Sequence, residues 1–258
     1  MKRYRITVAY DGTNYHGWQE QAGAVTIESV LNETLSRVLG EDIHVMGASR
    51  TDAGVHAYGN VAVFDSETTI PGDRISYAVN PHLPEDIRIM RSEETDPDFH
   101  PRYAACRKTY AYHIYNGRIP NPARRLYSCQ VPVPLDLGAM QEAGKYMEGT
   151  YDFKCFCAAG AQVKTTVRTV NEVRVIRNTA ADGEGEEITV FVTGEGFLYN
   201  MVRIMVGTLI KVGRHVYPPS HVEEIIASRD RTLAGDTAPA KGLFLQKIEY
   251  LPEDRERS

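Results

Sequence analysis

The sequence predicts an α+β protein made of two ferredoxin-like halves, residues 1–100 and 101–258, each with the element order βαββαβ. Two observations predict this fold. Segments with apolar residues at every second position, typical of strands, are interspersed with segments whose apolar residues recur at helical spacing. The chain of 258 residues is also long enough for one large domain or two small ones. Its composition, 42% hydrophobic and 24% charged, is ordinary for a globular protein with a core.

The first half follows this order element by element. Its first helix begins after Thr26, a typical N-cap residue, with Ser29 three residues later. A proline opens the second, shorter helix. The expected segments are strands at residues 4–10, 43–46, 56–64 and 87–90, and helices at residues 26–39 and 71–79.

The second half repeats the order less clearly, and the two halves show no visible sequence identity. The expected segments are strands at residues 108–115, 167–176, 188–192 and 243–250, and helices at residues 135–147, 198–212 and, inserted before the last strand, 220–227. Two such halves leave open sheet faces and a seam, where we expect a ligand cleft. The proline-rich segment 116–134 is expected to be an exposed basic loop.

The net charge of -5 argues against a polyanionic partner, but the distribution of the charges argues for one. Residues 99–135, 153–171 and 196–222 contain no Asp or Glu, whereas the acids gather in residues 92–98, 184–187 and the C-terminal tail. This distribution predicts a basic face on an acidic protein. The alternative is a set of scattered, solvated charges. The cations of these stretches include Arg102, Arg107, Lys108, Arg118, Arg124, Arg125, Lys154, Lys164, Arg168, Arg203, Lys211 and Arg214.

The sequence also bears on the compartment. Nothing approaches 18 consecutive apolar residues, and the first residues lead directly into a strand pattern, so we expect a cytoplasmic protein. Cys155 and Cys157 are one residue apart, which is not the spacing of a C-x-x-C pair. We therefore expect all four cysteines to be free thiols.

Residues 50–57, with the sequence RTDAGVHA, are the most informative stretch of the chain. Asp52 lies in a short loop before a strand pattern, where an aspartate is ordinarily a turn residue. Taken alone, the interpretations as turn residue and as catalytic carboxylate are balanced. Arg50, Thr51 and His56 place more polar groups in this loop than a turn needs, which favours a chemical role.

The helix expected at residues 198–212 carries Arg203 among apolar neighbours. A buried guanidinium without a partner costs about 3 to 5 kcal/mol, so we expect an anion to meet it. Asp52 is the candidate partner. Such a pair would keep the carboxylate ionised, as a nucleophile requires.

Three further segments carry polar or aromatic groups. Strand alternation places Tyr110 and Tyr112 on one face with Lys108, where a phenol could reach a base-sized ligand, although tyrosines in strands are more often structural. Trp18, in the segment 10–19, either stacks on a base or packs in the core. The cluster of two aspartates and a histidine at residues 96–100 is too small to predict a metal site.

These motifs together resemble the TruA family of tRNA pseudouridine synthases. Residues 50–57 resemble the active-site motif of that family, and the other family-like segments follow in family order over nearly the whole chain. They are residues 10–13 with 17–19, 99–103, 108–112, 200–203 with Gly207, and 238–239 with 242–243. The departure is Pro101, where the family more often has alanine, which puts only the details of that loop in question.

The resemblance implies a fold and a set of site residues. The fold is two ferredoxin-like halves that form a continuous antiparallel sheet with a basic central cleft, in a homodimer. Asp52 would be the catalytic residue and Arg203 its ion-pair partner. Tyr110 would stack on the target base and accept its proton, and Arg50 would position the substrate. Together with the acid-free stretches, this leads us to expect substrate contacts from Tyr110, Arg102, Arg107, Lys108 and Arg168.

The implied activity is isomerisation of uridine to pseudouridine in the anticodon stem-loop of tRNA, at tRNA positions 38, 39 and 40, without metal or organic cofactor. The alternative is a noncatalytic RNA-binding protein, because paired ferredoxin-like sheets with aromatic residues also bind RNA. A third hypothesis is a metal-dependent hydrolase that uses His56, Asp96, Asp98 and His100.

Overall fold

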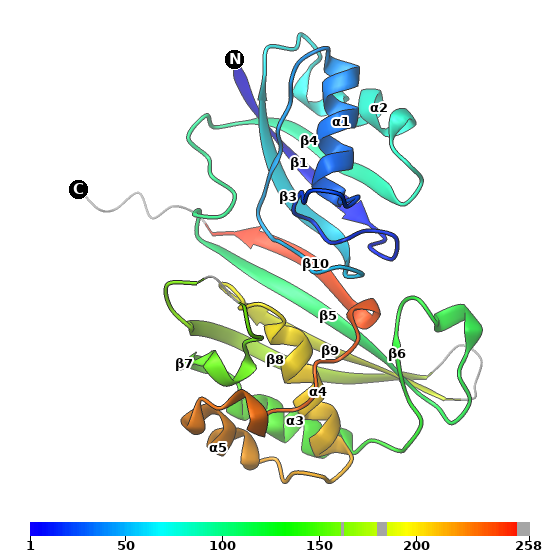
Figure 1. Cartoon of the computed structure of the whole chain (residues 1–258), viewed down its shortest axis with the longest axis vertical. Coiled ribbons are helices and arrows are strands. Elements are labelled where there is room, and N and C mark those ends of the chain that lie inside the picture. The colour runs from blue at the N-terminus through cyan, green and yellow to red at the C-terminus, as the bar shows by residue number, and fades with distance from the viewer. Residues whose placement is uncertain (161–162, 180–184, 252–258) are drawn as a thin grey trace. The chain divides into compact units, whose positions relative to one another are not determined.

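The structure, a computed structural model, describes residues 1–160, 163–179 and 185–251 (Figure 1). The acidic tail and Glu184, which the charge analysis included, lie outside these residues. Contacts within the chain group it into two units. Unit 1 comprises Met1–Cys106 and Phe244–Ser258, and unit 2 comprises Arg107–Leu243. Each unit is described by itself.

Unit 1 contains a sheet in the order β4-β1-β3, with β2 and β10 both paired to β3. The pairs are antiparallel except for β10, which runs parallel to β3 at His56 and Ala57. The elements are β1 (Lys2–Tyr10), α1 (Ile27–Leu39), β2 (Met46–Gly47), β3 (His56–Ser66), α2 (Ile75–Val79), β4 (Ile87–Thr95) and β10 (Leu243–Tyr250). The predicted order βαββαβ of the first half is confirmed.

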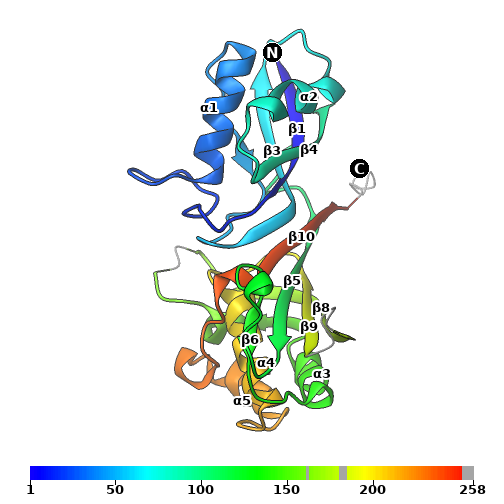
Figure 2. The same cartoon turned by 90° about the vertical axis from the view of Figure 1, so that its right-hand side faces the viewer.

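Helices α1 and α2 contact each other and lie on one face of this sheet (Figure 2). Thr26 caps α1 in the expected way, because its side chain accepts from the Ser29 N–H and the Ser29 hydroxyl accepts from the Thr26 N–H. Of the strand predicted at 43–46, only Met46 lies in the observed two-residue strand β2. The N–H groups at Ile43 and Val45 are instead bound by side chains of α1, Ser36 Oγ and Asn32 Oδ1.

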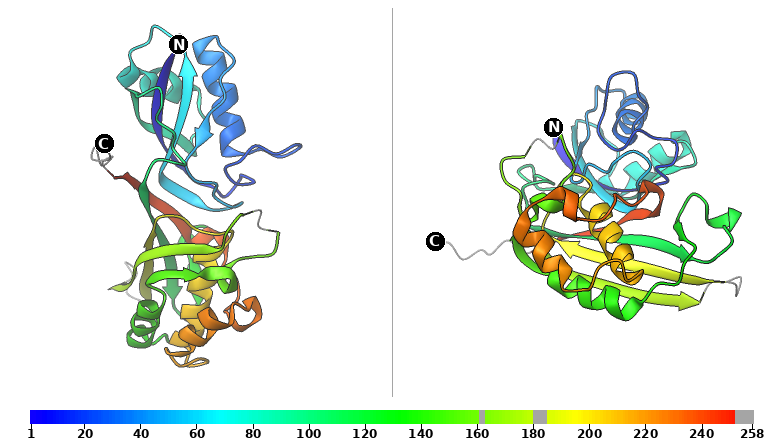
Figure 3. Two further views of the ribbon diagram at one scale, coloured as in Figure 1. Left: turned by 90° about the vertical axis from the view of Figure 1, so that its left-hand side faces the viewer. Right: turned by 60° about the horizontal axis from the view of Figure 1, so that its bottom comes forward.

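Within unit 2 the strand order is β5-β9-β8-β7 with antiparallel pairs, and β6 runs parallel to β5. Its elements are β5 (Cys106–Asn116), β6 (Cys129–Val131), α3 (Leu137–Tyr146), β7 (Gly149–Asp152), β8 (Val167–Thr179), β9 (Glu186–Gly194), α4 (Met201–Gly213) and α5 (His221–Ser228). Helix α3 contacts β8, α4 and α5, and the three helices lie together on one side of the strands (Figure 3). The α+β class and a large, mostly antiparallel sheet are confirmed, whereas the ferredoxin-like classification of the halves remains a prediction.

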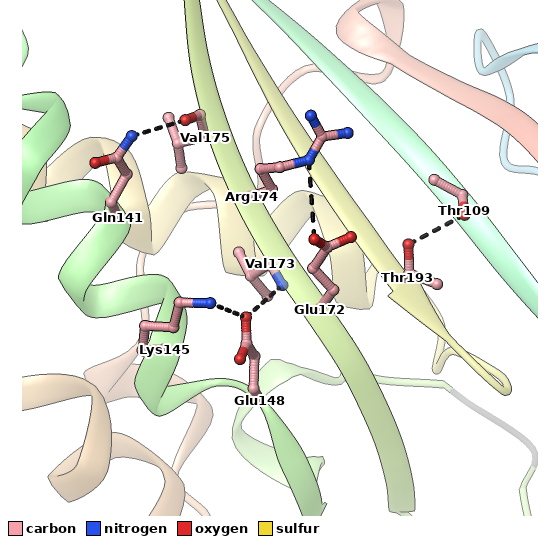
Figure 4. Close-up of polar contacts among 9 residues, drawn as sticks. All are labelled: Thr109, Gln141, Lys145, Glu148, Glu172, Val173, Arg174, Val175 and Thr193. Carbon is pink, nitrogen blue, oxygen red and sulfur yellow. Dashed lines mark hydrogen bonds and ion pairs between the residues drawn. The ribbon is translucent and has the colours of Figure 1, made fainter.

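Side-chain hydrogen bonds join the layers of unit 2 (Figure 4). Gln141 on α3 donates to the carbonyl oxygen of Val175 at 3.0 Å. Glu148, just after α3, accepts from the N–H of Val173 at 3.0 Å. These contacts bind α3 and the residues just after it to the backbone of β8.

The prediction of an exposed basic loop at residues 116–134 is wrong in part. Cys129–Val131 forms β6, and Cys129 and Val131 are buried. The side-chain amide of Asn116, at the end of β5, donates to the carbonyl oxygens of Val131 and Val133, both at 2.7 Å. These bonds hold the end of the segment against β5. Arg124 is ion-paired with Glu187 and is therefore not a free cation of this segment.

Among the described residues, no helix is both long and apolar enough to cross a membrane.

Candidate active site

The Asp52 loop, residues 50–55, leads into β3 through a tight turn. The N–H of Val55 donates to the carbonyl oxygen of Asp52 at 3.1 Å, and Gly54 has a φ of 75°. An aspartate that fastens such a turn would accept from the N–H two residues on, but the Gly54 N–H donates to the Tyr15 carbonyl oxygen at 3.3 Å. The turn therefore closes through its backbone. The side chain of Asp52 is half-buried.

The segment 10–18 holds this loop from one side. The hydroxyls of Tyr10 and Thr51 share a buried hydrogen bond of 2.7 Å, and the Trp18 N–H donates to the Thr51 carbonyl oxygen at 3.0 Å. Trp18 is fully buried, and its indole N–H donates to Glu28 at 3.2 Å. Of the two interpretations of Trp18, core packing is confirmed and base stacking is wrong.

Two glycines allow the segment to approach the loop so closely. A Cβ on Gly12 would lie 2.0 Å from the Val55 carbonyl oxygen. Gly17 has a φ of 88°, and a Cβ there would lie 2.6 Å from the Thr51 carbonyl oxygen. Both distances are far below van der Waals contact. The backbone at Gly12 and Gly17 is thus the surface against which the Asp52 loop packs.

His56 has a structural position that the sequence did not reveal. Its ring is 1% exposed and stacks on Phe244 with 4.5 Å between the ring centroids. Nδ1 lies 3.1 Å from the Gly12 N–H and 3.0 Å from Asp11 Oδ1, two contacts that need opposite protonation of Nδ1. Because the backbone N–H is always a donor, we assign the Nδ1 lone pair to Gly12. His56 thereby ties the turn at Asp11 and Gly12 to the start of β3.

Arg50 and Arg102 are the two predicted cations of unit 1. Arg102 Nε donates to the carbonyl oxygen of Gly47 at 2.8 Å, three residues before the exposed Arg50. Partial burial lowers the pKa of Arg102 from its usual value, and the charge of Arg50 lowers it further. The fold therefore gathers two positive charges beside the strand that leads to Asp52.

In unit 2, Arg203 lies in the first turn of α4 and is half-buried. Its Nε donates to the Ala238 carbonyl oxygen at 2.7 Å, and its Nη1 donates to Asn200 Oδ1 at 2.7 Å. The Ala238 N–H returns a hydrogen bond to the Arg203 carbonyl oxygen at 3.1 Å. The guanidinium is thus held at two of its nitrogens, which fixes the plane of the group.

Close backbone packing explains how Ala238 reaches Arg203. A Cβ on Gly207, one turn further along α4, would lie 1.8 Å from the Asp236 carbonyl oxygen. The Gly235 N–H donates to the Thr208 hydroxyl at 2.8 Å. Only a glycine at position 207 lets the segment 234–238 lie against α4. Because this segment carries the Ala238 carbonyl oxygen that binds Arg203, Gly207 helps to orient Arg203 indirectly.

Tyr110 lies on β5 and is 8% exposed. The ring of Phe197 packs edge-on against it, with 5.3 Å between centroids and an interplanar angle of 88°. Two residues along, on the same face of the strand, the Tyr112 hydroxyl donates to the Pro239 carbonyl oxygen at 2.8 Å. Burial raises the pKa of Tyr112, and the charge of Arg203 partly offsets this rise. The tyrosine face of β5 and Arg203 therefore belong to one neighbourhood of unit 2.

The other predicted contacts differ in their surroundings. Arg107 is exposed and Lys108 is half-buried. Arg168 is half-buried, its Nη1 donates to the Thr165 carbonyl oxygen at 2.9 Å, and burial lowers its pKa. Lys211, from the third acid-free stretch, lies 3.4 Å from Asp236, an acid outside that stretch. A stretch without Asp or Glu in the sequence can therefore still lie next to an acidic residue in the folded chain.

The residues of the metal hypothesis serve other purposes. Asp96 accepts from the Asp98 N–H at 2.8 Å and so forms a local turn, while His100 Nδ1 accepts from the Arg102 N–H at 3.2 Å. In the part of the chain that the structure describes, no three His, Cys, Asp or Glu residues are grouped to hold a metal ion.

Comparison with known proteins gives one consistent result. A family model described as tRNA pseudouridine synthase matches residues 6–104 and 143–251. The chain is 49% identical over 250 residues to the tRNA pseudouridine synthase A of Ruminiclostridium cellulolyticum, covering 97% of this chain and 100% of that protein. It is 45% identical to the protein of the same name from Syntrophomonas wolfei, covering 98% of this chain and 99% of that protein. The corresponding protein of Acetivibrio thermocellus is also 45% identical, over 97% of this chain and all of that protein.

Proposed function

The chain belongs to the tRNA pseudouridine synthase family, and on this premise we propose that it isomerises uridine to pseudouridine in the anticodon stem-loop of tRNA with Asp52 as its catalytic residue. The observation that carries the assignment is the Asp52 loop. Its backbone packs against Gly12 and Gly17 of the segment 10–18, and a backbone hydrogen bond from the Val55 N–H to the Asp52 carbonyl oxygen closes its turn. A rigid, half-buried carboxylate of this kind suits catalysis, because the reacting group must be held in place before the reaction.

The reaction requires a carboxylate of this type. The bond between N1 of the uracil and C1′ of the ribose breaks, the freed ring rotates, and C5 forms a new bond to C1′. The proton on C5 then leaves, and N1 ends with a proton. In that sequence a carboxylate such as Asp52 can act as the nucleophile, and a separate group accepts the C5 proton. Substrate and product contain the same atoms, so the reaction consumes no co-substrate, and we propose that it proceeds without metal or organic cofactor.

We assign Arg203 as the ion-pair partner of Asp52 and Tyr110 as the residue that stacks on the uracil and accepts its proton. The two bonds that hold the guanidinium of Arg203 and the edge-on packing of Phe197 on Tyr110 support these roles, because both groups are held rigidly. A paired arginine favours the ionised form of a carboxylate. Stacking on an aromatic ring contributes about 1 to 3 kcal/mol per base.

The basic residues would bind the tRNA backbone. We assign this role to Arg50 and Arg102 in unit 1 and to Arg107, Lys108 and Arg168 in unit 2. A uridine inside a stem must be extruded at a cost of a few kcal/mol, and contacts to neighbouring phosphates offset this cost. We further propose that the protein acts in the cytoplasm as a homodimer, for which sedimentation velocity of the full chain is the direct test.

Tritium release from tRNA labelled at uridine C5 tests the assignment, because isomerisation exchanges this hydrogen whereas binding alone does not. Asp52→Asn should abolish release and still bind tRNA. The matched control is Asp96→Asn, since Asp96 is an exposed loop carboxylate and an amide oxygen can accept the same hydrogen bond from the Asp98 N–H. Release by the Asp52→Asn variant at the wild-type rate would exclude Asp52. Binding without release by the wild type would favour a noncatalytic RNA-binding protein.

The ion pair has a separate test. Asp52→Asn, Arg203→Ala and the double variant should show strong non-additivity in tRNA affinity and thermal stability, because each single change leaves the other charge without its partner. Additive effects would mean that the two residues do not interact.

A further inference from the structure

We propose that Asn200 is a positioning residue for Arg203, which sets the orientation of the guanidinium for catalysis without touching the substrate. The inference rests on the proposed function, since it deepens the role assigned to Arg203. Asn200 is the N-cap residue of α4.

Asn200 occupies an unfavourable backbone conformation. Its φ of 59° and ψ of 7° are left-handed, a region that residues with a side chain rarely adopt. Asparagine tolerates this region better than most residues, and glycine tolerates it best. A demand for the left-handed conformation alone would therefore favour glycine. The presence of a side chain at position 200 needs another explanation.

Helix capping does not provide that explanation. Asn200 is the N-cap of α4, and asparagine is among the preferred capping residues because its side-chain oxygen usually accepts an N–H of the first turn. Here the side chain makes no capping bond. Oδ1 instead accepts from Nη1 of Arg203 at 2.7 Å. A residue suited to capping has been turned to hold the side chain of the third helical residue.

The choice of an amide fits the need of Arg203. Both anchors named here, Asn200 Oδ1 and the Ala238 carbonyl oxygen, are uncharged acceptors. They fix the plane of the guanidinium without neutralising its charge. An aspartate at position 200 would hold the group equally well but would offset that charge. A glycine would relieve the backbone and lose the anchor.

The chain allows a clean experiment, because Asn200→Gly removes the acceptor without straining the backbone. We expect kcat for pseudouridine formation to fall about 10- to 100-fold, as small displacements of a catalytic group do. KM for tRNA and the midpoint of thermal unfolding should stay close to wild type. Asn200→Asp should retain more kcat than Asn200→Gly, because it keeps the acceptor. The matched control is His215→Gly, another left-handed non-glycine position, which should leave kcat unchanged.

Coupling to Arg203 separates positioning from a structural role. In an Arg203→Ala background, Asn200→Gly should cause no further loss of kcat, because the group that it positions is gone. A full loss in that background, or wild-type kcat in Asn200→Gly alone, would overturn the inference.

A readout that does not need activity keeps the two proposals distinguishable. The Nη1 hydrogens of Arg203, one of which Asn200 Oδ1 accepts, are identified by their absence from an Arg203→Ala spectrum and should exchange with water faster in Asn200→Gly than in wild type. Unchanged exchange would overturn the positioning role even if the protein made no pseudouridine. An inactive wild type with faster exchange in the variant would reject only the proposed function.

Discussion

Asn60 binds both peptide groups of Ser49 through its side-chain amide. Nδ2 donates to the Ser49 carbonyl oxygen at 2.9 Å, and Oδ1 accepts from the Ser49 N–H at 3.3 Å. Asn60 is fully buried on β3, and Ser49 lies one residue before the Asp52 loop. The amide thus substitutes for a strand partner at the point where the chain leaves β2.

Asn60→Ala should lower the free energy of unfolding by about 1 to 3 kcal/mol for each backbone group left without a partner. Urea denaturation measures the change. Ser49→Ala is the matched control, because Ser49 Oγ is buried without a hydrogen-bond partner among the described residues, and its removal should be neutral or slightly stabilising. A larger loss in Ser49→Ala than in Asn60→Ala would show that the hydroxyl, not the amide, is the important group.

Gly17 and Gly23 provide a test position and a control position for the packing of the segment 10–18 against the Asp52 loop. Both have left-handed φ angles, 88° and 77°, but a Cβ on Gly23 meets nothing within 4 Å. Gly23→Ala should therefore cost only the conformational strain, about 1 to 2 kcal/mol. Gly17→Ala should cost more and reduce kcat, because it displaces Thr51 and Asp52. Equal stability and equal kcat in the two variants would refute this support.

Arg102 and Lys211 differ in whether an acidic side chain lies beside their charge. Arg102 donates to the backbone carbonyl oxygen of Gly47, whereas Lys211 lies 3.4 Å from the carboxylate of Asp236. Arg102→Ala should reduce the slope of log Kd for tRNA against log salt concentration by about 1, the value for one lost phosphate contact. Lys211→Ala should leave the slope unchanged. A reduced slope for Lys211 but not for Arg102 would contradict the assignment of the phosphate contacts.

The sequence predicted what local patterns encode. The Thr26 cap, the alternation in β1 and β3, and the long helix with Arg203 all leave a periodic signal within about fifteen residues, so the element order of the first half was predictable. The short strands β6 and β7 of the second half were not predicted. The Asp52 motif was found for a similar reason, since its polar groups are consecutive.

Features that depend on distant parts of the chain could not be predicted in this way. The parallel pairing of β10 with β3 joins Phe244 to His56, and no local pattern announces it. The roles of Asn60, His56 and Asn200 depend on which backbone group each side chain meets after folding. Their residue types are common in turns and strands, so their types alone gave no signal.

The ion pair between Arg3 and Asp65 should make the stability of unit 1 depend on pH. Arg3 grips both carboxylate oxygens, at 2.8 and 2.7 Å, and these hydrogen bonds lower the pKa of Asp65 below its usual value of 3.8. A lowered pKa means that the ionised group stabilises the folded state. Its contribution is complete above pH 3.8 and is lost as the pH falls through the pKa of the folded protein.

Asp65→Asn should therefore be less stable than wild type at pH 7, by about 1 kcal/mol because the pair is partly exposed to solvent. The difference should shrink as the pH falls below 3.8, because the wild-type carboxyl also becomes neutral. Urea denaturation of both proteins between pH 7 and pH 3 measures it. Arg74→Ala is the control, since Arg74 is an exposed cation of the same unit whose neighbour Asp73 is 3.7 Å away. A difference between Asp65→Asn and wild type that stays constant over this range would show that Arg3 does not lower the pKa of Asp65.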